Sequence, residues 1–400
     1  MANIHDFLSK NAVVSKLARS RSRVAAVGHA NDSGAAPPEK LAVLYCEGFF
    51  GDPDGKTANG LVRHSKRYKI IAVIDSRYAG MDSGTVLDKV PNGIPIRRDM
   101  ADVIAKAATI PSIFVYGIAP ADGQLPDKDR QVLLNAMKRG MSLVSGLHYY
   151  LNDSPEFVAE KLANGVLIDD VRKPPPISEL RTFTGAISNL WIPRIAVLGT
   201  DCAIGKRTTA TILTNALNEG GIKAVLIATG QTGIIQGEIH AAALDAIPSQ
   251  FCAGALEGLV LDACDMEKPD VVIIEGQGAL SHPAYCTSAF ILRGSQPHAV
   301  ILQHAPARRQ RCDFPSMSMP NPRDEIEMIE AFSDAKVIGL TISHEGLAVA
   351  GIDDTIAELQ QSLKMPVTDA LERPTGELVS MALNVFPNLR SKWTSADPVA

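Results

Sequence analysis

A glycine-containing loop between a strand-like run and a helix-like run constrains the fold of this chain more than any other feature. The apolar run is Arg194–Leu198, and helical spacing of apolar residues follows over 210–217. Such a loop aims backbone N–H groups and a helix N-terminus at an anion, and Lys206 adds a point charge. We therefore predict a P-loop that binds the phosphates of a ligand through Gly199, Thr200, Asp201, Cys202, Ala203, Ile204, Gly205, Lys206, Arg207, Thr208 and Thr209.

Two details depart from the common G-x-x-x-x-G-K-[ST] pattern. One extra residue lies between Gly199 and Gly205. Arg207 occupies the place after the lysine, where a Ser or Thr hydroxyl normally binds Mg²⁺. Thr208 comes one position later and points roughly 100° further round a helix. The loop therefore predicts anion binding and leaves Mg-ATP hydrolysis open.

Composition narrows the class of protein. At 400 residues the chain is long enough for two domains, and 46% hydrophobic residues indicate a globular fold. A formal net charge of -5 without a basic stripe argues against nucleic acid as a partner. The six cysteines form no C-x-x-C pair, and no apolar run approaches the roughly 18 residues of a membrane span. We expect a cytoplasmic protein without a membrane partner.

The alternation of strands and helices predicts an α/β protein with two parallel sheets. A helical or loop lead-in is expected over 1–37, and its basic stretch 10–23 leaves a transit peptide as the weaker alternative. A Rossmann-like domain over 38–173 precedes a proline-stiffened linker over 174–190. A P-loop NTPase-like domain follows over 191–375, and a C-terminal extension over 376–400. The predicted strands are 41–46, 68–75, 112–117 and 142–146, then 195–199, 224–229, 271–275, 299–303 and 336–342.

The first domain lacks a dinucleotide fingerprint. Gly48, Gly51 and Gly55 do not form G-x-G-x-x-G, although Asp75 sits where a ribose-binding acid would lie. Acids end many strands for other reasons. We expect a scaffold that completes a cleft or an oligomer, with dinucleotide binding as the less favoured alternative.

Acidic and histidine side chains follow the strands of the second domain. Glu275 ends the strand 271–275 and should face the ligand of Lys206, as a Mg²⁺ ligand or a general base. His282 lies in the next loop, and His304 and His344 follow two later strands. Each histidine is a candidate proton acceptor, and a purely structural role is the alternative for each. None of the histidine spacings indicates zinc, so no metal is predicted.

Candidate substrate-binding residues come from four loops of the second domain. Arg308 and Arg309, in a cluster with Arg311, can hold carboxylates bidentately, and a solvated surface is the alternative. The small polar or aromatic candidates are Gln231, Thr232, Gln277 and Tyr285.

Together these motifs resemble the D-glutamate N-acetyltransferase family. The resemblance rests on the loop 199–209, on 229–233, 275–278 and 281–285, and on 117–120 and 145–148 of the first domain. It implies an enzyme that moves acetyl from acetyl-CoA to the amine of D-glutamate. It also implies a Rossmann-like domain joined to a P-loop domain, and a homodimer.

The residues and the resemblance agree at the loop. Coenzyme A offers a pyrophosphate and a 3′-phosphate, which a P-loop can cradle without hydrolysis and without a metal. Two alternatives stay open. An ATP- and Mg-dependent ligase or carboxylase resembling dethiobiotin synthetase shares the loop spacing and would release ADP. A nucleotide-sensing module would bind a nucleotide and turn over no amino acid.

Overall fold

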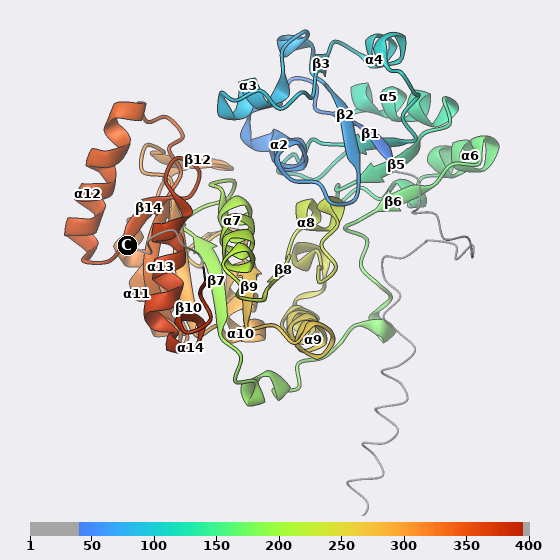
Figure 1. The fold of residues 1–400 in the computed structure, drawn as a ribbon. Coiled ribbons are helices and arrows are strands. Elements are labelled where there is room, and N and C mark those ends of the chain that lie inside the picture. Colours follow the sequence, from blue (N-terminus) through green and yellow to red (C-terminus); the bar gives the residue numbers. More distant parts are fainter. Residues whose placement is uncertain (1–39, 395–400) are drawn as a thin grey trace, which may run out of the picture. The chain divides into compact units, whose positions relative to one another are not determined.

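The computed structural model describes residues 40–394. The predicted lead-in over 1–37, with its basic stretch, lies outside the described residues. Two six-stranded sheets and a two-stranded hairpin make up the strands of the described part. Figure 1 shows each large sheet with helices packed around it.

The first sheet has the strand order of a Rossmann fold. From edge to edge the strands are β3 (Ile96–Arg97), β2 (Lys69–Ile74), β1 (Leu41–Tyr45), β4 (Ile113–Tyr116), β5 (Ser142–Ser145) and β6 (Ile168–Asp170). All neighbouring strands are parallel. The order reverses between β1 and β4, and in open α/β sheets ligands bind outside the carboxyl ends of the strands at such a point. The predicted Rossmann-like domain is confirmed.

Helices join these strands. They are α2 (Lys56–Arg63), α3 (Ser83–Asp88), α4 (Met100–Lys106), α5 (Asp127–Lys138) and α6 (Pro155–Asn164). α5 buries Leu133, Leu134 and Met137, whose spacing places them on one face of a helix. Asp75, the possible ribose ligand, is fully buried, and its Oδ2 accepts the N–H of Phe50 at 2.9 Å. Its carboxylate therefore holds the turn after β1.

The second sheet carries the P-loop near its centre. Its order is β14 (Val367–Asp369), β13 (Lys336–Ile342), β10 (Ala299–His304), β7 (Arg194–Gly199), β9 (Val271–Glu275) and β8 (Ala224–Ile227), all parallel. The connecting helices are α7 (Lys206–Glu219), α8 (Gln231–Gln236), α9 (Ser249–Glu267), α10 (Thr287–Ser295), α11 (Pro322–Phe332) and α12 (Ile352–Leu363). The predicted strands are thus present, with ends shifted by one or two residues. A short hairpin, β11 (Gln310–Arg311) and β12 (Phe314–Ser318), follows β10 and was not predicted.

The C-terminal segment belongs to the second domain. The last helices are α13 (Thr375–Val385) and α14 (Pro387–Arg390). Leu378, Val379 and Leu389 are fully buried in one cluster with Ile195 and Val197 of β7. The predicted extension over 376–400 is therefore part of the domain's core as far as the described residues reach. The sequence alone could not predict this packing, because an amphipathic terminal helix has the same residue pattern whether or not it packs on the domain.

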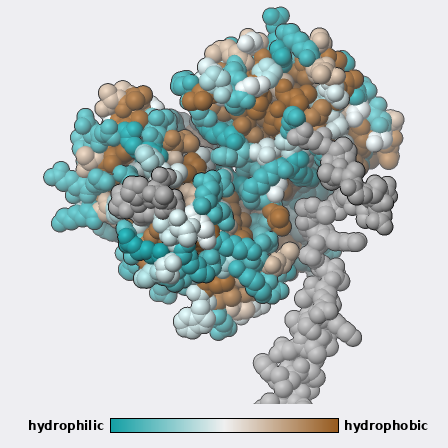
Figure 2. All heavy atoms as spheres, viewed as in Figure 1, coloured by the Kyte–Doolittle hydropathy of each residue, from teal (hydrophilic) through white to brown (hydrophobic). Residues whose placement is uncertain are grey.

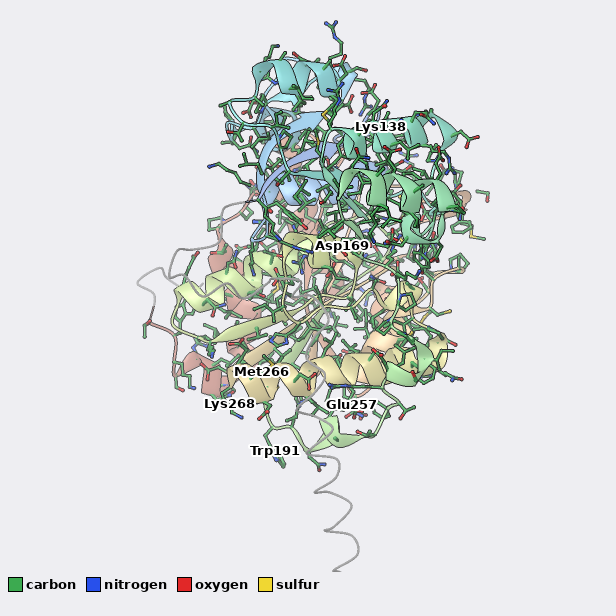
Figure 3. All side chains as sticks on the ribbon, turned by 90° about the vertical axis from the view of Figure 1, so that its right-hand side faces the viewer. Lys138, Asp169, Trp191, Glu257, Met266 and Lys268 are labelled. Atoms are coloured by element: carbon green, nitrogen blue, oxygen red, sulfur yellow. The ribbon has the colours of Figure 1, made fainter. Side chains whose placement is uncertain are left out.

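The segment between the two domains packs along α9 and is not a free linker. An added Cβ on Gly254 would lie 2.4 Å from the carbonyl oxygen of Arg181, so only glycine permits this approach. Glu257 accepts the backbone N–H of Thr184 at 2.6 Å and that of Ile187 at 3.3 Å. Figure 3 shows Glu257 on α9 and the 95% exposed Trp191 at the far end of the segment.

Among the described residues, no helix is both long and apolar enough to cross a membrane. Figure 2 shows hydrophilic and hydrophobic residues intermixed on the visible face. Hydrophobic spheres gather mainly over the part that Figure 1 draws in blue to green.

Candidate active site

The predicted P-loop forms between β7 and α7. Gly205 adopts φ +100°, a conformation that favours glycine, and α7 starts at the next residue. Lys206 is 6% exposed, and its Nζ donates to the carbonyl oxygen of Asp201. Burial lowers the pKa of Lys206. The loop thus presents the N-terminus of a long helix and a buried amine, which suits an anionic ligand.

Arg308, which follows β10, binds the P-loop through hydrogen bonds to three of its residues. Its guanidinium donates to Asp201 Oδ2 at 3.1 Å and to the carbonyl oxygens of Cys202 at 2.8 Å and Ala203 at 3.2 Å. It also pairs with Glu345 at 2.7 Å. Both terminal nitrogens of Arg308 are therefore engaged by protein acceptors, which argues against a role in binding a substrate carboxylate. Arg309, the other predicted carboxylate ligand, is exposed and its side chain has no bonding partner among residues 40–394.

Arg207 follows the loop lysine, at the sequence position that a Mg²⁺-binding Ser or Thr occupies in nucleotide hydrolases. Its guanidinium donates to Glu238 Oε1 at 2.8 Å, to Gln236 Oε1 at 2.9 Å and, more weakly, to Glu275 Oε2 at 3.4 Å. All three charged side chains are at most 13% exposed. A fixed cation therefore neutralises the strand-end acid that normally helps to bind the metal.

Glu275 is tied to its surroundings through one oxygen. Oε2 accepts the backbone N–H of Thr229 at 3.1 Å in addition to the contact with Arg207. Burial raises the pKa of Glu275, and the charge of Arg207 opposes that rise. The predicted proximity of Glu275 to the loop is present. Glu275 therefore positions Arg207 through their ion pair, and it remains a candidate general base.

His282 presents a donor toward the loop. Its Nδ1 accepts the backbone N–H groups of Ala284 at 3.3 Å and Tyr285 at 3.2 Å. In the neutral ring the proton must then reside on Nε2, which faces Asp201 Oδ1 at 3.8 Å. Both atoms are buried and neither has a hydrogen-bond partner. Burial, followed by the charge of Arg311, lowers the pKa of His282, so the neutral form is favoured.

His304 and His344 have structural partners at the strand ends. His304 Nδ1 shares a hydrogen bond of 2.9 Å with the hydroxyl of Thr200. Burial lowers the pKa of His304 to about 4. His344 lies 2.8 Å from Asp369 through Nδ1. Both histidines lie at the predicted edge of the sheet, but their contacts hold the loop and the end of β14.

One cluster has the composition of a metal site. The ligand atoms of Asp201, Cys202 and His282 all lie within 4.8 Å of one another. A metal-bound histidine donates its second ring N–H to an acceptor, whereas His282 Nδ1 faces two backbone donors. Metal binding at Nε2 would leave Nδ1 and these donors in conflict. The hydrogen bonds therefore favour a protonated Nε2 over a metal ligand.

Three of the other predicted substrate residues bind the protein itself. Gln231 accepts from Arg172 at 2.8 Å, Thr232 shares a hydrogen bond of 3.3 Å with Thr57, and Gln277 donates to the carbonyl oxygen of Thr229 at 2.7 Å. Tyr285 differs, because its hydroxyl donates to Asp313 at 3.0 Å and its ring stacks on His282 at 4.4 Å between centroids. It connects the loop region to a cavity nearby.

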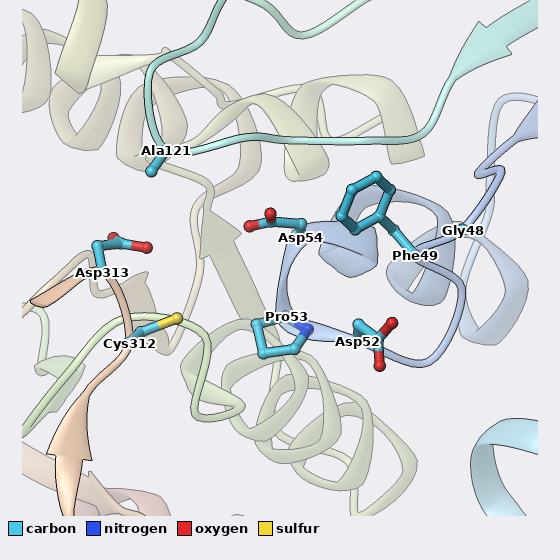
Figure 4. A pocket seen from close by; sticks show the side chains of 8 residues that line it. All are labelled: Gly48, Phe49, Asp52, Pro53, Asp54, Ala121, Cys312 and Asp313. Carbon is cyan, nitrogen blue, oxygen red and sulfur yellow. The ribbon is translucent and has the colours of Figure 1, made fainter. Parts of the chain in front are cut away.

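That cavity has a volume of about 450 Å³ and was missed from the sequence. The turn after β1, the loop after β4 and the β11–β12 hairpin form its wall, with the lining residues Gly48, Phe49, Asp52, Pro53, Asp54, Ala121, Cys312 and Asp313 (Figure 4). It therefore lies at the point where the order of the first sheet reverses. The sequence signal was present, since Asp52-Pro53-Asp54 follows a buried strand, but the hairpin that completes the wall lies far away in the chain.

Comparison with known proteins matches both domains. Residues 76–174 match the Rossmann-like domain of DUF1611, a domain of unknown function, and residues 181–379 match its P-loop domain. The D-glutamate N-acetyltransferase of Tritonibacter scottomollicae is 32% identical over 285 residues, which cover 69% of this chain and 82% of that protein. The chain belongs to the D-glutamate N-acetyltransferase family.

A second relative and a solved structure agree. A D-glutamate N-acetyltransferase of a Pseudoalteromonas species is 32% identical over 274 residues, covering 67% of this chain and 80% of that protein. The crystal structure of a DUF1611 family protein from Anabaena variabilis superposes with a TM-score of 0.78 at 30% identity, covering 86% of this chain and all of that one. The two DUF1611 domains meet between 174 and 181, inside the segment that packs on α9.

Proposed function

We propose that this member of the family transfers an acetyl group from acetyl-CoA to the amino group of D-glutamate. The observation that carries the proposal is the match to two D-glutamate N-acetyltransferases over at least 80% of their length. The geometry of the loop is compatible with it, because acyl transfer needs an anion site for a coenzyme and no phosphoryl transfer.

In this proposal the P-loop binds the phosphates of coenzyme A. Lys206 and the N-terminus of α7 supply positive charge. Arg207 supplies the charge that a metal would otherwise bring to Glu238 and Glu275. The loop can therefore hold a pyrophosphate without a divalent ion, and we propose no metal requirement. We also propose that the protein works in the cytoplasm as a homodimer.

Each of the three candidate proton acceptors, Glu275, His282 and His304, is engaged by protein groups in the structure. His282 carries its proton on the nitrogen that faces the loop, and His304 is bonded to Thr200. Glu275 is paired with Arg207. The pantetheine arm also separates the thioester of acetyl-CoA from its pyrophosphate by many bonds. A side chain beside the loop would therefore contact the phosphates of the coenzyme and lie far from the reacting carbonyl group.

The test is acetylation of D-glutamate after exhaustive EDTA treatment, with and without ATP. The proposal expects N-acetyl-D-glutamate and free coenzyme A at an undiminished rate in both cases. The ligase alternative is favoured by the shared loop spacing and by Glu275 at the strand end. It requires Mg²⁺ and ATP and releases ADP, so strict dependence on both would replace our proposal with that one.

Replacing the loop lysine tests where the coenzyme binds. Lys206→Ala removes the buried amine of the anion site, so we expect the KM for acetyl-CoA to rise by about tenfold or more, from loss of a charge-assisted contact. The KM for D-glutamate should stay near the wild-type value. Steady-state kinetics with each substrate varied in turn measure this, and circular dichroism confirms folding. An unchanged KM for acetyl-CoA would place the coenzyme elsewhere.

A further inference from the structure

The cavity at the switch point of the first sheet carries two carboxylates that face each other. Figure 4 shows the side chains of Asp54 and Asp313 pointing into the space between them, while Asp52 points away. Asp52 pairs with Arg77 at 2.8 Å. The carboxylate of Asp54 has no hydrogen-bond or ion-pair partner among residues 40–394. Burial raises the pKa of Asp54, and the negative charge of Asp313 adds to the rise.

Two lysines without carboxylate partners flank the same cavity. Lys56 follows Asp54 closely in the chain and starts α2, and its charge acts on Asp54 and on Lys206 of the P-loop. The Nζ of Lys128 lies 5.9 Å from the ring centroid of Phe49, which lines the cavity. Both lysines are exposed, and neither forms an ion pair with a residue of the described part. The cavity is therefore acidic inside and basic at its edge.

The floor of the cavity connects it to the loop. Cys312 lines the cavity, and its backbone N–H donates to Asp201 Oδ2 at 2.8 Å. Tyr285 joins Asp313 to the stacked ring of His282. Asp201 Oδ1 and His282 Nε2, both buried and without hydrogen-bond partners, lie 3.8 Å apart behind these contacts. The cavity wall is thus connected to the P-loop through Asp201 and His282.

We propose that this cavity binds the amino acid that accepts the acetyl group. Its ammonium group lies between Asp54 and Asp313. Its two carboxylates point toward Lys56 and Lys128. This proposal rests on the acetyltransferase function proposed above, and it assigns the acceptor site to residues that neither the sequence motifs nor the comparisons single out.

Charge and reach both favour this assignment. An unpartnered carboxylate in a half-buried cavity binds an ammonium group by a charge-assisted hydrogen bond. A dicarboxylic amino acid matches this arrangement of charges, because its ammonium group pairs with the two carboxylates inside the cavity and its two carboxylates pair with the two lysines at the edge. The cavity is adjacent to the P-loop, because Cys312 lines the cavity and its backbone N–H donates to Asp201 of the loop. A coenzyme anchored by its phosphates at the loop would therefore extend its pantetheine arm toward the acceptor.

The position of Asp54 also supplies a route for the proton. The ammonium passes one proton to the Asp54 carboxylate, and the free amine attacks the acetyl carbon. The C–N bond forms as the C–S bond breaks. The coenzyme leaves as a thiol after taking the second proton from nitrogen, and Asp54 returns its proton to solvent. A carboxyl group with a raised pKa is suited to this exchange.

Two substitutions that each remove one carboxylate charge from the first domain test the proposal. Asp54→Asn should lower kcat/KM for D-glutamate by about a hundredfold or more, while the KM for acetyl-CoA stays unchanged. Asp88→Asn is the matched control, because Asp88 lies outside the cavity lining and pairs with Arg63 at 2.6 Å, and we expect a change of less than about threefold. Asp54→Asn with the kinetics of Asp88→Asn would overturn the proposal.

A competitor without an amine separates substrate binding from a general loss of activity. Glutarate has both carboxylates of glutamate and no ammonium group. Wild-type protein should bind D-glutamate at least about tenfold more tightly than glutarate in calorimetry, and Asp54→Asn should abolish this preference. Asp313→Asn should reduce it as well. A preference that persists in both variants would contradict the proposed orientation.

The edge lysines provide an independent arm. Lys128→Ala should raise the KM for D-glutamate by about tenfold, and Lys138→Ala, on the same helix and exposed (Figure 3), should not. Equal effects of the two substitutions would overturn the role of Lys128. If wild-type protein neither acetylates nor binds D-glutamate, the proposed function itself fails, and the acceptor site fails with it.

Discussion

His304 ends β10 inside the protein and is held there as a neutral ring. It is 7% exposed, and its Nδ1 is bonded to the Thr200 hydroxyl at 2.9 Å. Burial lowers its pKa from 6.5 to about 4. The unfolded chain therefore binds a proton at this residue more readily than the folded one does. The cost of keeping the ring neutral is absent above pH 6.5 and grows as the pH falls toward 4.

We predict that His304→Gln reduces the acid sensitivity of the fold. The wild-type protein should lose about 2 to 3 kcal/mol of unfolding free energy at this residue between pH 7 and pH 4.5, and the glutamine variant should lose none of this share. Urea unfolding of both proteins at the two pH values measures the difference. The same loss in both proteins would show that His304 is not kept neutral by the fold.

Arg207 unites three elements around the first turn of α7. Its partners come from the end of α8, the residue Glu238 beyond it, and the end of β9. Removing the guanidinium would leave the buried Glu275 without its ion-pair partner, whereas Glu238 would keep its ion pair with Lys66. Loss of the partner of a buried carboxylate costs roughly 3 kcal/mol or more. In this P-loop the Arg207 guanidinium therefore takes the place of the Mg²⁺ ion that other P-loops bind.

Arg207→Thr should convert this element toward a metal-binding loop. The substitution places a hydroxyl after Lys206 and frees Glu275 from its ion pair, so we predict that Mg²⁺ raises the affinity for ADP at least about tenfold in the variant. In wild-type protein and in Arg207→Lys the ion should change the affinity less than about twofold. Titration calorimetry with ADP, in Mg²⁺ and in EDTA, measures this. Equal Mg²⁺ responses in all three proteins would contradict the role of Arg207.

The helices and strands around the P-loop could be predicted from local sequence patterns, but the side-chain contacts between residues distant in the chain could not. The strand before the loop, the loop itself and α7 follow from residues adjacent in the chain, so their prediction was confirmed. The partners of Arg207 lie 29 to 68 residues away, and those of Arg308 lie 37 to 107 away. A side chain that the sequence suggests is free to bind a substrate, such as Arg308, can therefore be held by protein acceptors in the fold.

At the scale of the whole described molecule, each sheet has its own core, and apolar as well as polar contacts join the two. Ile235 of α8, in the second domain, is fully buried in the core cluster of the first sheet. The first sheet packs in one cluster, and the two faces of the second sheet pack in two others. Between them, Gln236 Nε2 donates to the carbonyl oxygen of Gly60 at 2.8 Å, and Lys66 pairs with Glu238 at 3.0 Å. The acceptor site proposed above depends on these contacts, because its wall comes from both sheets.

Arg172 makes the most buried of these contacts. It follows β6 of the first sheet, and its side chain is 8% exposed. Its guanidinium donates to Gln231 at 2.8 Å and lies 2.8 Å from Asp245, both of the second domain. Arg172→Ala would leave Asp245 and Gln231 without this partner. Because Asp245 is only 26% exposed, water compensates in part, and we expect a loss of about 2 kcal/mol of unfolding free energy.

Arg181 provides the matched comparison, since it pairs with Asp262 on the surface, where the side chains are 52% and 45% exposed. Arg181→Ala should cost less than about 1 kcal/mol. Urea unfolding followed by fluorescence and circular dichroism measures both variants, and Arg172→Ala should also separate the two signals as the sheets begin to unfold independently. If both arginine variants lose the same free energy in a single transition, the two sheets are joined by something other than Arg172, and the wall of the cavity does not depend on it.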